Sequence, residues 1–168
     1  GVELKADLSP LTIADKLSND TIIGYLSSTK LPVLSEEGKS IHFSERKNWN
    51  QFWMVDPLDG TKEFIKRNGE FTVNIALIEN HNSVMGVIYA PATDVLYYGC
   101  KGIGSYMMQN ASAFINGNEP VLFEEIKTRS ELLPVKQKEN LFTVVASRSH
   151  LSTETEALIS ELRNNHGE

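Results

Sequence analysis

The stretch Trp53-Met-Val-Asp-Pro-Leu-Asp-Gly-Thr-Lys-Glu-Phe64 decides the interpretation of this chain, because an apolar segment leads directly into two carboxylates, a glycine and a hydroxyl. Residues 52–55 have the character of a short buried strand, which the following proline and glycine are expected to end at once. Asp56 and Asp59 should therefore lie close together at the strand end. Two such carboxylates repel each other unless a cation or proton lies between them, and hard oxygen ligands suit Mg²⁺, Mn²⁺ or Ca²⁺. The alternative is a solvated turn in which aspartate is only a turn former.

The same run resembles the signature of the inositol monophosphatase superfamily of metal-dependent phosphatases, Asp-Pro-[Leu/Ile]-Asp-Gly-Thr followed by a short helix. The continuation from Lys62 to Ile78 resembles the CysQ branch, the 3′(2′),5′-bisphosphate nucleotidases. Inositol monophosphatases usually carry Thr-Asn-Phe where this chain has Thr-Lys-Glu-Phe at 61–64. Three further segments agree in order and separation: Lys5 to Asp15, Pro32 to Glu37 and Val144 to His150. The resemblance therefore spans essentially the whole chain.

Composition is that of an ordinary globular protein. The chain has 168 residues, of which 40% are hydrophobic and 23% charged, and no apolar run approaches the roughly 20 residues of a membrane span. It opens with no signal segment, and its single cysteine, Cys100, cannot form an internal disulfide. We therefore expect a cytoplasmic protein without a transmembrane segment, with peripheral attachment at the inner membrane left open.

The net charge of −6 argues against a nucleic-acid polymer as partner, because such partners usually need a basic face. A small anionic substrate is compatible with this charge, since bound metal ions can invert the local field. The local basic group of Lys62, Lys66 and Arg67 is either part of such a site or a solvated helix face. The oligomeric state is not given by the sequence.

The first half of the chain shows alternating helix and strand patterns. A helix is expected from Thr12 to about Ser28, with Thr12 as N-cap and Asp15 completing a capping box. A strand over 32–35 delivers Glu36 and Glu37, and an irregular connection over 38–50 leads into the central strand. After a short helix over 61–67 that ends near Gly69, three strands are expected to form an antiparallel meander: 71–78, 84–89 and 95–98. Residues 105–108 are a candidate for one more strand.

The second half is more polar. Asn116-Gly117 predicts a turn, and 124–140 is expected to be a linker or domain joint. A buried strand over 141–146 and a helix over 153–163 should follow. We accordingly expect a metal- and phosphate-binding domain over 1–123, then a joint and the first part of a second domain over 124–168. The resemblance implies a layered α+β fold, inositol monophosphatase-like, with a mainly antiparallel sheet. It also implies a fragment that lacks the first helix and a later Trp-Asp motif.

The resemblance also implies the roles of particular residues. The metal ligands would be Glu36, Asp56, the backbone carbonyl of Leu58 and Asp59, holding two or more Mg²⁺ ions in the intact enzyme. Glu37 either supports a ligand or is merely solvated. Thr61 is a helix N-cap, a hydroxyl that orients the attacking water, or both. Asp15 would accept the proton of Thr61, although a capping box alone would also explain an aspartate there.

Substrate contacts follow from the same resemblance. They would come from Glu36, Leu58, Asp59, Gly60, Thr61, Ser147, Arg148 and His150. Gly60 would let the backbone approach a phosphate closely, and the Ser-Arg-Ser-His segment would lie near the nucleotide. A lone histidine after a strand is also a common structural residue.

The expected activity is removal of the 3′-phosphate of adenosine 3′,5′-bisphosphate by a Mg²⁺-dependent phosphatase, which gives AMP and phosphate and serves sulfate assimilation. An inositol monophosphatase or a broader sugar phosphatase is the alternative enzyme. A non-catalytic metal-binding fragment is the alternative from another class, because the absent Trp-Asp motif normally supplies one more ligand.

Overall fold

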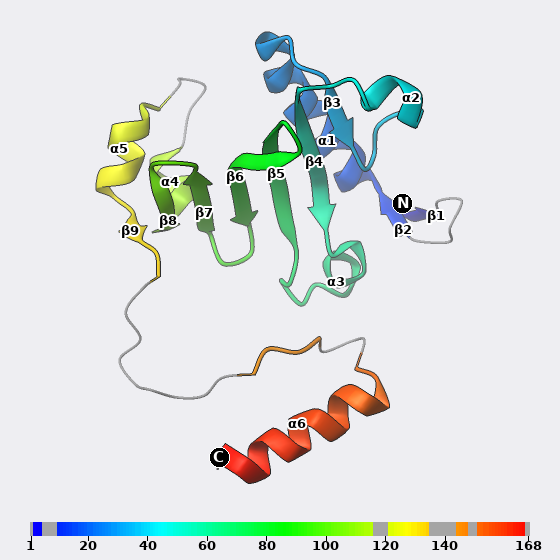
Figure 1. The fold of residues 1–168 in the computed structure, drawn as a ribbon, viewed down its shortest axis with the longest axis vertical. Helices are drawn as coiled ribbons and strands as arrows, with labels where there is room; N and C mark the ends of the chain where they lie inside the picture. Colours follow the sequence, from blue (N-terminus) through cyan, green and yellow to red (C-terminus); the bar gives the residue numbers. More distant parts are fainter. Residues whose placement is uncertain (1, 5–9, 116–120, 135–143, 148–150, 167–168) are drawn as a thin grey trace. The chain divides into compact units, whose positions relative to one another are not determined.

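The computed structural model describes residues 2–4, 10–115, 121–134, 144–147 and 151–166, which form two compact units, Gly1–Val135 and Lys136–Glu168. A seven-stranded sheet dominates the described part of the first unit, in the order β3-β4-β5-β6-β7-β8-β9 (Figure 1). Its strands are β3 Val33–Ser35, β4 Gln51–Asp59, β5 Thr72–Glu79, β6 Asn82–Ala90, β7 Val95–Cys100, β8 Gly104–Gln109 and β9 Glu131–Leu132. Strand β3 is parallel to β4, and every later neighbour is antiparallel. The expected mainly antiparallel sheet and its meander are confirmed.

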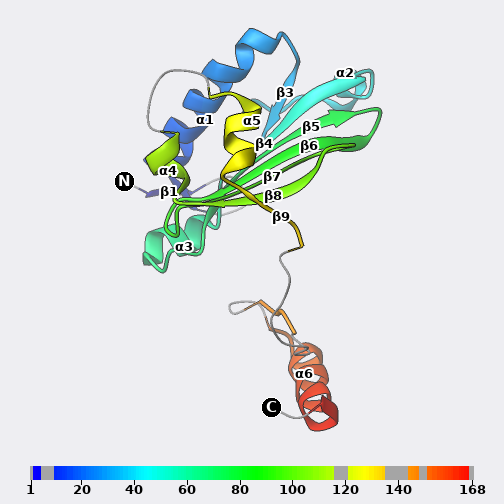
Figure 2. The ribbon, with the colours of Figure 1, turned by 90° about the vertical axis from the view of Figure 1, so that its left-hand side faces the viewer.

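Helices cover one face of this sheet. The helices of the first unit, within the described residues, are α1 Ile13–Leu26, the 3₁₀ helix η1 Ser27–Thr29, α2 Phe43–Arg46, α3 Thr61–Lys66, α4 Ala111–Phe114 and α5 Phe123–Thr128. The second unit has α6 Thr153–His166, which is described by itself. A small antiparallel pair, β1 Val2–Leu4 and β2 Pro10–Thr12, precedes α1. Figure 2 shows α1 and α5 on the same face of the sheet. None of the helices in the described ranges has the length and apolar character needed to cross a bilayer.

The core lies between these helices and the sheet. Beneath α1, Trp53 and Val55 of β4 are 8% and 2% exposed. Beneath α5, the Tyr98 ring packs edge-on against Phe123. Side chains alternate along a strand, so every second residue points to the face of the sheet opposite the helices. On that face Met54 of β4 and Ile88 of β6 are 45% and 46% exposed. Asp56 is two residues from Met54 and shares that face, which brings a carboxylate to the side of the sheet away from α1.

Strand β4 differs from the prediction. It was expected to end before Pro57, yet it continues through the proline to Asp59. The register shifts between Asp56 and Asp59, where one extra residue enters β4. A bulge of this kind leaves residues out of the hydrogen-bond ladder, so the missing N–H of proline is tolerated there.

Three further segments correct the expectations. The connection over 38–50 contains α2, whose first turn is capped by His42 through a hydrogen bond from the Ser44 amide. The stretch expected as a linker begins with α5 and β9, because the Phe123 ring packs edge-on against Tyr98 of β7. Residues 144–146 form no strand, and Val145 is 93% exposed.

The remaining expectations have mixed outcomes. The helix over 153–163 is confirmed and ends later, at His166. The short helix after the motif is confirmed as α3, but the left-handed residue that follows it is Arg67, with φ 57°, two positions before Gly69. Residues 116–117 and 141–143 lie outside the described residues. The domain division at 123 and 124 stays a prediction.

Candidate metal and phosphate site

Pairing between β3 and β4 places the first carboxylates together. Ser35 lies opposite Val55 in the parallel register, and the Glu36 amide donates to the Val55 carbonyl at 3.0 Å. Glu36 therefore leaves β3 beside the point where β4 reaches Asp56. Its side chain is exposed, whereas Asp56 is half-buried. Two segments that are twenty residues apart in sequence thus bring their acidic residues to one edge of the bulge.

The bulge fixes the rest of the motif. Its extra residue lets the Leu58 amide turn back and donate to Asp56 Oδ1 at 3.2 Å, while the Leu58 side chain is buried. The Pro57 carbonyl accepts a hydrogen bond from Ser18 of α1 at 2.8 Å. The loop is thereby anchored to the first helix. Asp59 ends β4 with an exposed carboxylate.

The Asp56 carboxylate lies where its ionised form is electrostatically disfavoured. Burial, together with the negative charges of Glu36 and Asp59, raises the pKa of Asp56 from 3.8 to about 6, while the Leu58 amide acts in the opposite direction. A cation among these carboxylates would relieve the repulsion, and the donor set consists of hard oxygens. The chemistry of the donors therefore fits Mg²⁺. No three acidic, imidazole or thiol side chains of the described ranges are grouped closely enough to hold a metal as they stand.

Asp15 and Thr61 meet across the fold. Asp15 is fully buried in the first turn of α1, and its Oδ1 accepts a hydrogen bond from Thr61 Oγ1 at 3.0 Å. Its Oδ2 accepts the Thr12 amide at 2.8 Å and the Thr12 hydroxyl, so the expected capping box is confirmed. One carboxylate thus serves the helix and also contacts the motif. Both interpretations of Asp15 are compatible with this geometry.

The N-cap interpretation of Thr61 is wrong. Gly60 is the N-cap of α3, and Thr61 is the first helical residue. The Thr61 hydroxyl is directed at Asp15, with the Leu58 carbonyl 3.3 Å away. A hydroxyl that donates to a carboxylate keeps its lone pairs available to accept from a third group, such as a water molecule.

Gly60 is required by the chain itself. Its φ of 90° lies in the left-handed region, and a Cβ there would be 2.8 Å from the Glu70 carbonyl oxygen. The left-handed φ and the short contact each make any side chain at this position energetically costly. Close approach to a phosphate is a separate expectation, which this geometry leaves untested.

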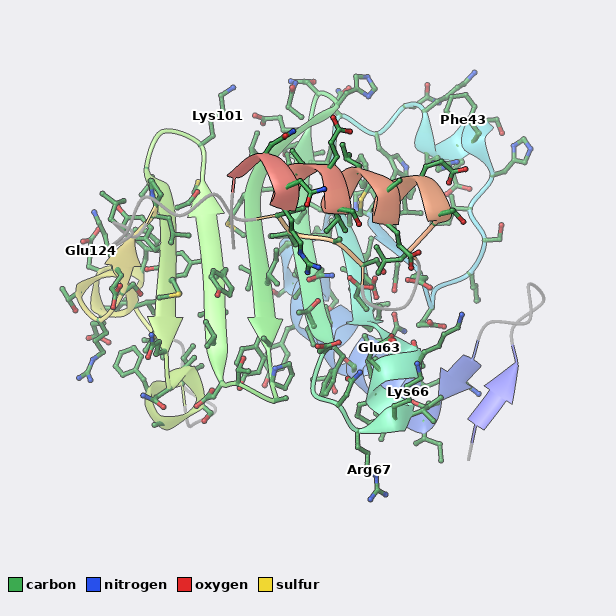
Figure 3. The ribbon with its side chains drawn as sticks, turned by 90° about the horizontal axis from the view of Figure 1, so that it is seen from below. Phe43, Glu63, Lys66, Arg67, Lys101 and Glu124 are labelled. Carbon is green, nitrogen blue, oxygen red and sulfur yellow. The ribbon has the colours of Figure 1, made fainter. Side chains whose placement is uncertain are left out.

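The other expected residues lie around the motif. The Glu37 amide donates to Ser35 Oγ at 3.3 Å. Lys66 pairs with Glu63 at 3.7 Å, and Arg67 extends away from α3 (Figure 3). Ser147 is exposed in the second unit. Arg148 and His150 lie outside the described residues.

The sequence analysis missed Asn74. It lies on β5 directly opposite Asp56, and its Nδ2 donates to Asp59 Oδ2 at 3.3 Å. Asn74 lies within the strand expected over 71–78. Its proximity to the motif would have required the strand register, which the sequence does not state.

Comparisons with known proteins agree with one another. A sequence profile of the inositol monophosphatase family matches residues 2–167. The 3′(2′),5′-bisphosphate nucleotidase CysQ of Salmonella typhimurium is 53% identical over 100 residues, which are 58% of this chain and 40% of that protein. The corresponding Escherichia coli K12 protein is 51% identical over 100 residues.

Solved structures give the same result. The crystal structure of CysQ from Bacteroides thetaiotaomicron superposes with a TM-score of 0.81 and 48% identity over 97% of this chain and 59% of that one. The suppressor protein SuhB from Bartonella henselae gives a TM-score of 0.57 and 34% identity over 64% of this chain and 41% of that one. This chain therefore spans 40% of the Salmonella relative's length and 59% of the Bacteroides chain.

Proposed function

Because the chain belongs to the inositol monophosphatase family, we propose that it carries the metal and catalytic residues of a Mg²⁺-dependent 3′(2′),5′-bisphosphate nucleotidase. The proposed reaction removes the 3′-phosphate of adenosine 3′,5′-bisphosphate and gives AMP and phosphate. The observation that supports phosphatase chemistry is the hydrogen bond between Thr61 and the buried carboxylate of Asp15. The nucleotide substrate is supported by the identity of 53% to the Salmonella nucleotidase.

In this proposal Glu36, Asp56, Asp59 and the Leu58 carbonyl would hold the Mg²⁺ ions. Bound Mg²⁺ would supply positive charge that offsets the charge on the phosphoryl oxygens. Without a cation, burial together with the charges of Glu36 and Asp59 raises the pKa of Asp56 to about 6. These carboxylates are therefore poised to gain from a positive neighbour.

The residues of the chain would prepare the nucleophile. The Thr61 hydroxyl donates to Asp15, so its oxygen can accept a hydrogen bond from a water and hold that water in line with the phosphorus. Thr12 fixes the Asp15 carboxylate through its amide and hydroxyl. As the water oxygen bonds to phosphorus, its proton passes through Thr61 to Asp15. The bond from phosphorus to the ribose 3′-oxygen breaks, and that oxygen leaves with a proton from solvent.

Substrate recognition would extend beyond the metal ligands. We propose that Gly60 and Thr61 contact the phosphate through the backbone that opens α3. The proposed contacts with the remainder of the nucleotide are Ser147, Arg148 and His150, on the resemblance of Ser-Arg-Ser-His to the nucleotidase branch. Cytoplasmic location and a place in sulfate assimilation are proposals of the same kind.

Two alternatives remain to be separated from this function. An inositol or sugar phosphatase is supported by the match of residues 2–167 to the inositol monophosphatase family as a whole. A non-catalytic metal-binding chain is the alternative from another class, because carboxylates can bind Mg²⁺ without hydrolysing a phosphate ester. The first predicts a different preferred substrate, and the second predicts Mg²⁺ binding without phosphate release.

A phosphate-release panel tests the proposal. The full-length protein is assayed with adenosine 3′,5′-bisphosphate, inositol 1-phosphate and fructose 1,6-bisphosphate, each with Mg²⁺ and with EDTA. We expect the highest kcat/KM with the nucleotide, and loss of turnover in EDTA and in Asp56→Asn. The matched control is Asp20→Asn, an exposed aspartate of α1 that should change nothing. A preference for either sugar phosphate would contradict the nucleotidase.

A further inference from the structure

We propose that Asn74 is a positioning residue that holds the Asp59 carboxylate in the orientation a divalent cation requires, and that Thr72 orients Asn74 for this task. The proposal rests on the metal-dependent function proposed above. It concerns a pair of neutral side chains on β5 and adds a third strand to a site otherwise built from α1, β3, β4 and α3.

The β4 bulge creates the contact. Asn74 lies opposite Asp56, and Thr72 lies opposite Asp59, because the two strands differ by one residue over this interval. The bulge therefore brings Asp59 within reach of a side chain that a regular ladder would pair with Asp56 alone. Nδ2 of Asn74 and Oδ2 of Asp59 are 3.3 Å apart.

The direction of the Asn74 amide follows from its partners. An ionised carboxylate only accepts hydrogen bonds, so the NH₂ end must face Asp59. The carbonyl end then faces Thr72, whose Oγ1 donates to Asn74 Oδ1 at 3.0 Å. Thr72 can rotate its hydroxyl to donate, and so all three groups are satisfied in one chain of hydrogen bonds.

These hydrogen bonds should affect cation binding, because the Asp59 carboxylate is exposed. A free carboxylate would have to lose rotational freedom when it binds a cation, whereas one held by Asn74 has already lost it. The amide is neutral, so it leaves the negative charge of Asp59 intact. It occupies Oδ2 and leaves the second oxygen available. Partners that orient metal ligands in this way typically change metal affinity by roughly 10- to 100-fold when removed.

Variants of the full-length protein test the proposal by calorimetric titration with Mg²⁺ alone. Asn74→Leu should weaken Mg²⁺ binding about tenfold, and Thr72→Val should weaken it in the same direction by less. Thr72→Ser keeps the hydroxyl and should bind as the wild type does. The matched control is Gln51→Leu, which removes an amide that donates to the Glu79 carboxylate at 2.6 Å across the other end of the same strand pair.

Two further measurements separate positioning from damage to the fold. Thermal unfolding in EDTA should be nearly unchanged in Thr72→Val, and the Mg²⁺ concentration for half-maximal phosphate release should rise in Asn74→Leu while kcat at saturating Mg²⁺ is largely kept. Wild-type affinity in Asn74→Leu, with weakened binding in Asp59→Asn, would overturn the role of Asn74 and leave the metal site in place. Absence of Mg²⁺ binding in the wild type would overturn both proposals. An equal loss of affinity in Gln51→Leu would also overturn the positioning role.

Discussion

Asp15 shows how one side chain can hold a helix and reach a distant motif. Its Oδ2 closes the capping box with Thr12, and its Oδ1 receives Thr61 from 46 residues further along the chain. Because the carboxylate is fully buried, it is held on both sides by fixed donors. A structural and a chemical role are therefore compatible in one residue, and substitutions on its two sides can separate them.

We expect Thr61→Ala and Asp15→Asn each to lower kcat by roughly 10²- to 10⁴-fold, because both remove the path that accepts the water proton. Mg²⁺ affinity, measured by calorimetry, should change much less. Thr12→Ala is the control, since it removes the Thr12 hydroxyl but keeps the Thr12 amide on Asp15 Oδ2 and the bond between Asp15 and Thr61. It should lower the free energy of unfolding by about 1 kcal/mol with little effect on kcat. If all three variants lose only stability, Asp15 is a cap and nothing more.

Asp56 should make metal-free stability depend on pH. Its pKa is raised from 3.8 to about 6, so the folded state binds the proton more tightly than the unfolded chain does. The stabilisation is complete below about pH 4 and is lost as pH rises through about 6. For a half-exposed group we expect a loss on the order of 1 kcal/mol after solvent screening.

Urea unfolding in EDTA at about pH 4 and pH 7 measures this effect. Asp56→Asn should remove most of the fall, whereas Asp20→Asn should keep it. Added Mg²⁺ should restore stability at pH 7 in the wild type. The same pH profile in the wild type and in Asp56→Asn would show that the charge of Asp56 is not disfavoured by the fold.

At the scale of elements, the bulge in β4 organises the site. It accommodates Pro57, turns the Leu58 amide towards Asp56 and brings Asp59 to Asn74. The chain then enters α3 through the left-handed Gly60. A strand end, a bulge and a helix start thus follow within six residues.

Gly60→Ala should lower the free energy of unfolding by at least about 1–2 kcal/mol, the cost of a left-handed alanine, with more from its clash with the Glu70 carbonyl. The matched control is Gly24→Ala in α1, where a Cβ meets nothing within 4 Å. There alanine should stabilise the protein by about 0.5–1 kcal/mol, because it favours the helix. Urea titrations of the two variants should move in opposite directions. Equal stability of Gly60→Ala and the wild type would show that the turn relaxes at no cost.

At the scale of the whole molecule, the candidate residues divide between the two units. Asp15, the carboxylates, Gly60 and Thr61 belong to the first unit, whereas Ser147, Arg148 and His150 belong to the second. The proposed metal and catalytic chemistry therefore depends on residues of the first unit. The proposed nucleotide contacts beyond the phosphate depend on residues of the second.

His150→Ala should accordingly raise KM for adenosine 3′,5′-bisphosphate more than KM for a small phosphate ester that lacks a base. Its Mg²⁺ affinity should equal that of the wild type, because the metal ligands are unchanged. Steady-state kinetics with the two substrates measure the difference. Equal changes in both KM values would remove His150 from nucleotide recognition. Ser152→Ala, two residues away, is the control for a general effect on this segment.

The sequence by itself determined the features that depend on neighbouring residues. The capping box joins Thr12 to Asp15 within one helical turn, and the alternation over 71–78 marks β5, so both are written in local pattern. The resemblance carried by the motif identified the family, the metal-ligand candidates and the expected fold. The local pattern failed at Pro57, because whether a proline ends a strand depends on the neighbouring strand and its register.

Only the tertiary structure decided which distant residues meet. The bond between Asp15 and Thr61, the place of Glu36 beside Asp56 and the support of Asp59 by Asn74 all depend on strand pairing and helix packing. A shift of one residue in the register would turn each side chain to the other face. Such a shift leaves local sequence patterns unchanged, so they cannot specify these contacts. The sequence identifies Asp56 and Asp59 as candidate ligands, and the bulge between them sets how their carboxylates are arranged.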